Sequence, residues 1–191
     1  MSLPPFRRLR VFTHAGLFLA AFGPSALLSQ STGPGVREAY FRAVAQHFDV
    51  PLDEVVVVGD WDLDPDEVPV VLFMSRSAGV SPDALIGLRR GGMLWREVAA
   101  RFGLGGRNFH LPLPEGEPLG FLARAYGEFR GHPPAEWHQI ELEDAEIIAL
   151  VNLRVLSEQV GVPPIRVLRS REEAGSFLAA FAMLRRQGVH R

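Results

Sequence analysis

A run of alternating aspartates is the stretch whose residue types and spacing come nearest to a site for chemistry. The run reads DWDLDPDE, and carboxylates at every second position are a common source of ligands for calcium. The EF-hand pattern requires glycine at the sixth position of its loop and glutamate at the twelfth, where this chain has Pro65 and Val71. We therefore interpret Asp64, Asp66 and Glu67 as residues that cap and charge the start of the next helix.

Three histidines, His110, His132 and His138, could take part in a metal site. No two of them have the i, i+4 spacing of ligands on one helix, and no carboxylate is placed to complete a site. The chain has no cysteine, which excludes disulfides, thiolate catalysis and metal sites with cysteine ligands. We expect no bound metal and no cofactor.

No motif for nucleophilic catalysis or phosphate binding stands out. Glu141, Glu143, Asp144 and Glu146 cluster before an apolar helical run, which favours a capping role with Asp144 as the cap. In that run Asn152 lies between apolar neighbours, where such a side chain usually satisfies the backbone of a nearby turn. An enzyme whose site is assembled from distant residues stays an open alternative, because such a site leaves no local pattern.

The elements that would position these residues are clearest in the stretch VPVVLFMSRSAGVSPDALIGLRRGGMLWREVAARFGL. Its near-continuous apolar run predicts a buried helix over 68–78, and Gly79 can end that helix in the left-handed conformation. Ser81 followed by proline predicts the start of a short second helix over 82–90. After a glycine pair, the apolar stripe over 93–102 predicts a third helix.

This unit of helix, tight turn and helix recurs along the chain. Aligning HFDVPLDEVV, SAGVSPDALI and QVGVPPIRVL places Asp49, Gly79 and Gly161 at one position, and these residue types tolerate the left-handed conformation. The sequence therefore predicts an all-α fold of repeated α-hairpin, helix-turn-helix-like units that stack on one another. The alternative is three unrelated helical turns with ordinary capping. The expected domain is residues 36–191, made of units 36–63, 67–104 and 144–188 and of a long loop insertion over 105–143.

The expected loop over 105–143 is rich in proline, glycine and aromatic residues. A connection of this length inside a compact domain is unusual and is often functional. Because arginine and aromatic residues dominate the energetics of protein interfaces, the candidate binding residues are Arg124, Tyr126, Arg130 and Trp137. The alternative is an ordered loop whose aromatic side chains hold it across the junction between units.

Two longer phrases, GVSPDALIGLRRGGMLWREVAARFGL and DAEIIALVNLRVLSEQVGVPPIRVLRS, resemble those of uncharacterised bacterial helical proteins that are usually predicted to be exported. The resemblance covers most of the chain beyond about residue 36. It implies a helical domain and no assigned activity, so it transfers no functional residue to this chain.

Residues 1–31 have the three parts of a secretory signal peptide. Three arginines precede an apolar run over 11–22, and Ser29-Gln30-Ser31 offers small residues at the cleavage positions. Removing this segment takes away three arginines and no acids, so the net charge would change from −2 to −5. We expect a periplasmic or secreted product with no transmembrane segment in the mature chain, because no run reaches membrane-spanning length. A cytoplasmic start with a buried N-terminal helix is the alternative.

The main functional alternative to a protein-binding or structural module of the cell envelope is a cytoplasmic helix-turn-helix protein that binds DNA. The stretch LFMSRSAGVSPDALIGLRRG resembles the helix-turn-helix of bacterial repressors. Its second helix, however, begins with Asp83, Ala84 and Leu85, which gives base edges and phosphates little to bind. We therefore expect a non-enzymatic helical protein with an envelope protein as its possible partner, and we do not favour nucleic acid. The sequence does not indicate an oligomeric state.

Overall fold

The computed structural model describes residues 34–188, and within this range it contains helices, turns and extended segments but no β-strand. The all-α prediction is confirmed, whereas the predicted signal peptide lies outside the described residues. The elements in chain order are α2 (Pro34–Phe48), α3 (Leu52–Gly59), η2 (Pro65–Glu67), α4 (Val68–Ala78), α5 (Pro82–Arg90), α6 (Trp95–Arg101), α7 (Gly106–Phe109), η3 (Gly120–Leu122), α8 (Ala123–Gly131), η4 (Trp137–Gln139), α9 (Asp144–Val160), α10 (Pro164–Ala174) and α11 (Phe177–Gly188).

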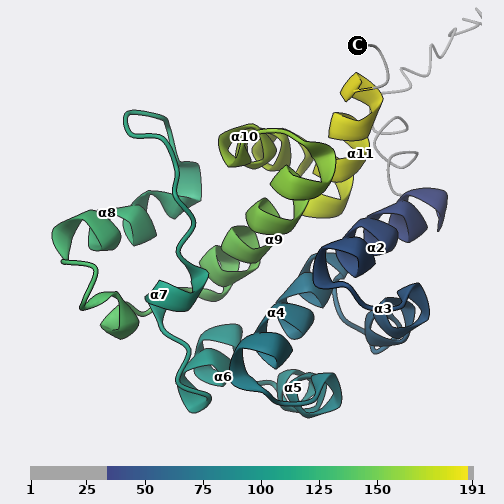
Figure 1. Cartoon of the computed structure of the whole chain (residues 1–191), viewed down its shortest axis with the longest axis horizontal. Helices are drawn as coiled ribbons and strands as arrows, with labels where there is room; N and C mark the ends of the chain where they lie inside the picture. Colours follow the sequence, from purple (N-terminus) through teal and green to yellow (C-terminus); the bar gives the residue numbers. More distant parts are fainter. Residues whose placement is uncertain (1–33, 189–191) are drawn as a thin grey trace, which may run out of the picture.

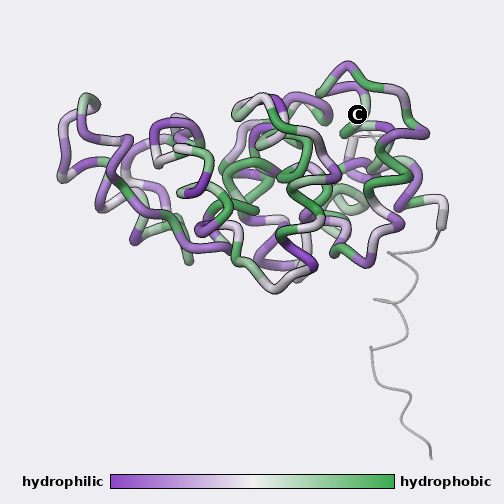
Figure 2. Tube along the Cα trace, turned by 90° about the horizontal axis from the view of Figure 1, so that it is seen from below, coloured by the Kyte–Doolittle hydropathy of each residue, from purple (hydrophilic) through white to green (hydrophobic). Residues whose placement is uncertain are grey.

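Helix α9 is the centre of the fold. It packs against α2, α4, α6, α10 and α11, and Leu150, Leu153 and Leu156 along it are fully buried. Figure 1 shows α9 crossing the middle of the molecule, with α8 at one end and α2, α3 and α11 towards the other. In Figure 2 the hydrophobic stretches gather along the central helices, and the end that contains α8 is more hydrophilic. Burial of apolar surface around α9 therefore supplies most of the core.

Three helix pairs are joined by the same kind of turn. Asp49, Gly79 and Gly161 have φ angles of 47°, 68° and 70°, which is the left-handed conformation that the alignment predicted. The valine after each of them donates its N–H to the carbonyl five residues earlier, at 3.1, 3.2 and 3.1 Å, as in a Schellman cap. The pairs α2–α3, α4–α5 and α9–α10 thus share one connection, while the common origin of the units stays a prediction.

The helices expected over 68–78 and 82–90 are present with those bounds. The third helix, expected over 93–102, begins at Trp95 and ends at Arg101. It starts late because Leu94 is extended and its N–H is held by the Glu97 carboxylate at 2.8 Å. Ser81 caps α5 as expected, since its side chain accepts the N–H of Ala84 at 3.4 Å.

The segment over 105–143 is only partly a loop. It contains α7, α8 and two short 3₁₀ turns, so the prediction of a continuous loop is wrong over these elements. The prolines lie at 112–118 and 133–134, which leaves the stretch between them free to form α8. The prolines are absent from residues 119–132, so the high proline content of the whole segment does not predict a loop in that part.

Candidate functional site

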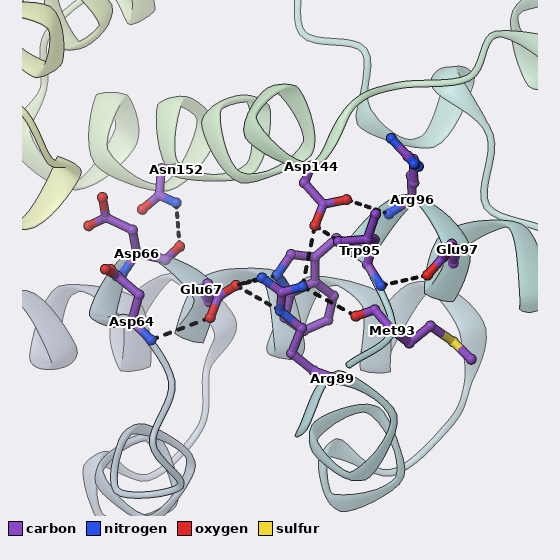
Figure 3. A network of polar contacts seen from close by, with 11 residues as sticks. Asp64, Asp66, Glu67, Arg89, Met93, Trp95, Arg96, Glu97, Asp144 and Asn152 are labelled. Carbon is purple, nitrogen blue, oxygen red and sulfur yellow. Dashed lines mark hydrogen bonds and ion pairs between the residues drawn. The ribbon is translucent and has the colours of Figure 1, made fainter. Parts of the chain in front are cut away.

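The densest polar contacts of the fold surround three carboxylates, Asp66, Glu67 and Asp144, here called the carboxylate cluster (Figure 3). Glu67, just before α4, is only 7% exposed. Arg89 from α5 donates to its Oε1 from Nε at 2.9 Å and from Nη2 at 2.5 Å, and the indole Nε1 of Trp95 from α6 donates to the same oxygen at 2.8 Å. A buried carboxylate paired in this way holds three helices together.

Asp144 lies in the first turn of α9 but caps a different helix. Its carboxylate accepts the backbone N–H groups of Trp95 at 3.0 Å and of Arg96 at 3.1 Å, at the start of α6. The expectation that Asp144 caps its own helix is therefore wrong. Glu143 is the N-cap residue of α9, and its N–H is bonded to the Glu146 carboxylate at 2.8 Å. The sequence correctly predicted that a helix begins at Asp144, but the carboxylate of Asp144 caps α6, which packs beside α9.

Asp66 likewise reaches a distant helix. Its two oxygens accept the N–H groups of Phe177 at 2.7 Å and of Leu178 at 2.9 Å, at the start of α11. Burial raises the pKa of this carboxyl from 3.8 to about 6, and the two backbone N–H groups only partly offset that effect. Of the three acids expected to cap the helix after the aspartate run, Asp64 and Glu67 do so in the turn that leads into α4. Asp64 accepts the N–H of Asp66 at 2.9 Å, and Glu67 Oε2 accepts the N–H of Asp64 at 3.3 Å.

Asn152 connects the central helix to the same turn. Its Nδ2 donates to the carbonyl of Asp66 at 2.8 Å, and its Oδ1 accepts the hydroxyl of Tyr40 at 2.5 Å. Asn152 and Tyr40 are both fully buried. The prediction that Asn152 satisfies the backbone of a turn is confirmed.

The carboxylate cluster is thus occupied by donors from the chain itself. Glu67 accepts from a guanidinium and an indole, while Asp66 and Asp144 each accept two backbone N–H groups. A general acid or base needs an oxygen that can approach a substrate. This arrangement therefore fits a clamp between helices better than a catalytic pair.

Three of the four candidate binding residues hold the 105–143 segment in place. Arg124 forms a two-pronged ion pair with the buried Glu146. Tyr126 is buried, its hydroxyl donates to the carbonyl of Leu111, and burial raises its pKa. Trp137 donates from its indole N–H to two backbone carbonyls, each at 3.0 Å. Arg124 and Arg130, both on α8, are exposed, whereas Tyr126 is buried and Trp137 is partly buried, so the four side chains do not form one surface.

The three histidines also have separate surroundings. The ring centroid of His110 lies 4.2 Å from that of Trp137, and burial lowers its pKa. His132 lies 3.4 Å from a glutamate on either side of it in the sequence, and His138 Nδ1 lies 2.9 Å from the carbonyl of Ala135. Between residues 34 and 188 no group of three or more histidine, aspartate and glutamate side chains could hold a metal ion.

The segment instead forms one wall of a groove, here called the α6 groove, which runs between α6 and residues 138–142 and has a volume of about 520 Å³. Small residues of α6, Ala99 and Ala100, line one side, and the apolar side chains of Phe109 and Ile140 lie in the opposite wall. Charged side chains from α6 and from residues 138–141 surround it. An apolar floor with a polar rim is the usual form of a binding groove.

Two adjacent glycines allow the second wall of the α6 groove to approach. A Cβ atom on Gly105 would lie 1.9 Å from the carbonyl oxygen of His138, and one on Gly106 would lie 2.9 Å from Cβ of Ile140. The N–H of Gly106 donates to the carbonyl of Ile140 at 3.0 Å. No pattern named from the sequence predicts the groove, although this glycine pair, a few residues after the third helix, is a signal of close backbone approach.

The geometry leaves little surface for reading DNA. In one frame the second helix is α5, which exposes Asp83 and Ala84 while Arg89 is committed to Glu67. If α6 is taken as the first helix of a helix-turn-helix instead, the recognition helix would be α7, which has four residues and ends at the buried Phe109. A major-groove helix needs several exposed residues that reach base edges.

Comparisons with protein-family models, curated proteins and solved structures returned no match for this chain. No helix between residues 34 and 188 has the length and apolar character needed to cross a membrane.

Proposed function

We propose that the chain is a non-enzymatic protein-binding module of the cell envelope, which holds an extended segment of its partner in the α6 groove. The observation that carries this proposal is the groove itself, with its small-residue wall, apolar floor and charged rim. The pattern of a signal peptide in residues 1–31 supports the envelope location.

An extended segment is the occupant that suits this groove. Ala99 and Ala100 on α6 let a backbone come close, and the facing wall is itself extended at Ile140, with φ −71° and ψ 118°. Ile140 already bonds its N–H to Trp137 and its carbonyl to Gly106. An extended peptide is therefore held mainly by every second side chain, which packs on the apolar lining of the groove. A rigid helix would bring a diameter of about 10 Å or more into the same space.

The test is to block the groove without disturbing the core. Ala100 is exposed and lines the groove, so Ala100→Trp fills the groove from the surface of α6. Ala123→Trp on α8 is the matched control, since Ala123 is exposed and does not line the groove. Peptides selected from a random display library on the unmodified protein should lose binding at least tenfold to the Ala100→Trp variant and keep it with the control.

Equal binding to both variants would remove the groove from the proposal. The envelope location has its own measurement, which is the intact mass and the compartment of the native protein after cell fractionation. A full-length cytoplasmic product would contradict the envelope role. Specific retention of duplex DNA by the same product would restore the helix-turn-helix alternative.

A further inference from the structure

A second surface stands out on α3, which lies at the periphery of the molecule beside α2 and α5 (Figure 1). Val57 is 56% exposed and Trp61, just beyond the end of α3, is 41% exposed; they are the large apolar side chains that the described residues leave exposed. Val57 lies in the last turn of α3, and Trp61 lies two residues beyond its end, where the Trp61 N–H donates to the carbonyl of Val58 at 3.4 Å, so both residues belong to the C-terminal end of this helix. Exposed apolar side chains that adjoin one another mark an interaction surface more often than scattered ones do.

Trp61 is held in place. The guanidinium carbon of Arg90, from α5, lies 5.5 Å from the centroid of the Trp61 ring. Such a cation–π contact orients the ring before any partner arrives. Tryptophan and arginine are also the residues most enriched among those that carry binding energy at protein interfaces.

The surroundings of this pair are acidic. Residues 53–64 contain five acids and no basic residue, and Asp53, Glu54, Asp60 and Asp62 are all exposed. Arg37 approaches Asp60 at 3.6 Å, but both side chains are largely in solvent, so this contact neutralises little of the local charge. We call the surface formed by Asp53, Glu54, Val57, Asp60 and Trp61 the acidic face of α3.

A hollow of about 370 Å³ adjoins this face. Arg37, Asp60 and Asp62 line it, next to Leu63 and Leu178. Arg37 donates to the carbonyl of Gly59 at 2.7 Å and lies 3.6 Å from Asp60. Asp62 is therefore the carboxylate of this hollow with which an incoming lysine or arginine can pair, while the alkyl stem of that side chain lies against the apolar lining.

From these observations we infer that the acidic face of α3 binds a basic segment of another protein. An apolar side chain of that segment packs on Val57 and Trp61, and a lysine or arginine pairs with Asp62 at the edge of the hollow, on the side away from Arg37. A second copy of this chain is a poorer occupant, because a symmetric contact through this face would set acids against acids. Anionic lipid and nucleic acid are repelled for the same reason.

This inference goes beyond the α6 groove and uses none of its residues, so either site can fail without the other. The probe is a synthetic 12-residue peptide of alternating leucine and arginine, compared with one in which every arginine is glutamate and one in which every leucine is serine. Affinity is measured by titration calorimetry at low and at physiological salt. We expect the leucine–arginine peptide to bind at least tenfold more tightly than either comparison peptide, and more weakly as salt is added.

Two variants and a charge-matched control locate the binding. Trp61→Ala and Asp60→Asn/Asp62→Asn should each weaken binding of the leucine–arginine peptide about tenfold. Glu115→Gln/Glu173→Gln changes the net charge equally at exposed positions elsewhere and should leave binding unchanged. The inference is overturned if the control variant loses as much affinity, if Trp61→Ala has no effect, or if the serine–arginine peptide binds as well. Self-association of the protein that disappears in Trp61→Ala would assign the face to a second copy and also overturn it.

Discussion

Burial and hydrogen bonding have opposite effects on the carboxyl of Asp66, and their balance can be measured. Burial favours its protonated form, whereas the N–H groups of Phe177 and Leu178 favour its charged form. Burial is the larger effect, so the pKa of Asp66 rises from 3.8 to about 6 on folding. The replacement that tests this is Asp66→Asn, which keeps the size of the side chain and removes its charge.

The direction of the pH effect follows from the sign of that change. Because the folded protein holds the proton of Asp66 more tightly than the unfolded chain, the contribution to stability is fully present below pH 3.8 and is lost as the pH rises through about 6. A difference from 3.8 to about 6 corresponds to about 3 kcal/mol, at roughly 1.4 kcal/mol for each pH unit. The asparagine variant has no such proton to bind.

The assay is urea unfolding followed by circular dichroism at several pH values between about 4 and 7.5. Other ionisable groups contribute to the pH dependence of the wild type and of the variant alike, and their contributions cancel when the two proteins are compared. The quantity to compare is therefore the free energy of unfolding of the wild type minus that of Asp66→Asn. We expect this difference to be about 3 kcal/mol more favourable to the wild type at the acid end.

Asp83→Asn, at an exposed aspartate of α5, controls for the loss of one negative charge. A difference between wild type and Asp66→Asn that stays constant with pH would refute the reasoning. A difference that shrinks on acidification would show that the two capping hydrogen bonds outweigh burial.

Three further replacements probe the clamp, the groove and the core. Glu67→Gln should cost about 3 kcal/mol, because it removes the carboxylate that Arg89 binds most closely and leaves its guanidinium only the longer contact with Asp144 at 3.4 Å, and urea unfolding of Glu67→Gln/Arg89→Met should recover part of the loss. Gly105→Ala should lower the melting temperature, because its Cβ would collide with the backbone of η4, while Gly127→Ala, with nothing near it in α8, should gain about 1 kcal/mol. Asn152→Ala should cost about 2 to 3 kcal/mol in urea unfolding, since it leaves a buried hydroxyl and a buried carbonyl unpaired; no loss would mean that water replaces the amide.

The local parts of the fold could be predicted from the sequence because their causes are local. Gly79 and Gly161 end helices since a left-handed residue lets the next N–H groups bond back into the last turn, and that choice is visible in four or five residues. Ser81 followed by a proline starts α5 for equally local reasons.

The partners of the acids could not be predicted in the same way. Spacing correctly indicated that Asp66 and Asp144 lie where helices begin, but Asp66 binds N–H groups 111 and 112 positions along the chain and Asp144 binds N–H groups 49 and 48 positions back. A capping pattern in the sequence predicts that a carboxylate lies near the start of a helix. Which helix start it serves depends on how helices meet in space, and a single sequence does not contain that information.

The internal partners of three candidate binding residues could not be predicted for a related reason. Arginine and aromatic side chains contribute to interfaces because they bury large areas with polar ends, and the same property makes them good internal anchors. Tyr126 and Trp137 use their polar ends on carbonyls of their own segment, and Arg124 uses its guanidinium on Glu146. The composition of the segment therefore indicates that its arginine and aromatic side chains make specific contacts. It does not indicate whether those contacts are with the rest of the chain or with a partner.

Asp144 links the interior clamp to the surface proposed to bind a partner. One wall of the α6 groove is α6, whose first N–H groups are bound to the Asp144 carboxylate, and the other wall is residues 138–142, which run directly into α9 at Asp144. Asp144 thus fixes the end of one wall to the end of the other, together with the exposed ion pair of Arg96 and Glu143 at 2.7 Å. The groove can hold its width without direct bonds across its floor, because the two walls cannot separate at this end unless both backbone caps break. A rigid groove loses little conformational entropy on binding, which is what a site for an extended segment requires.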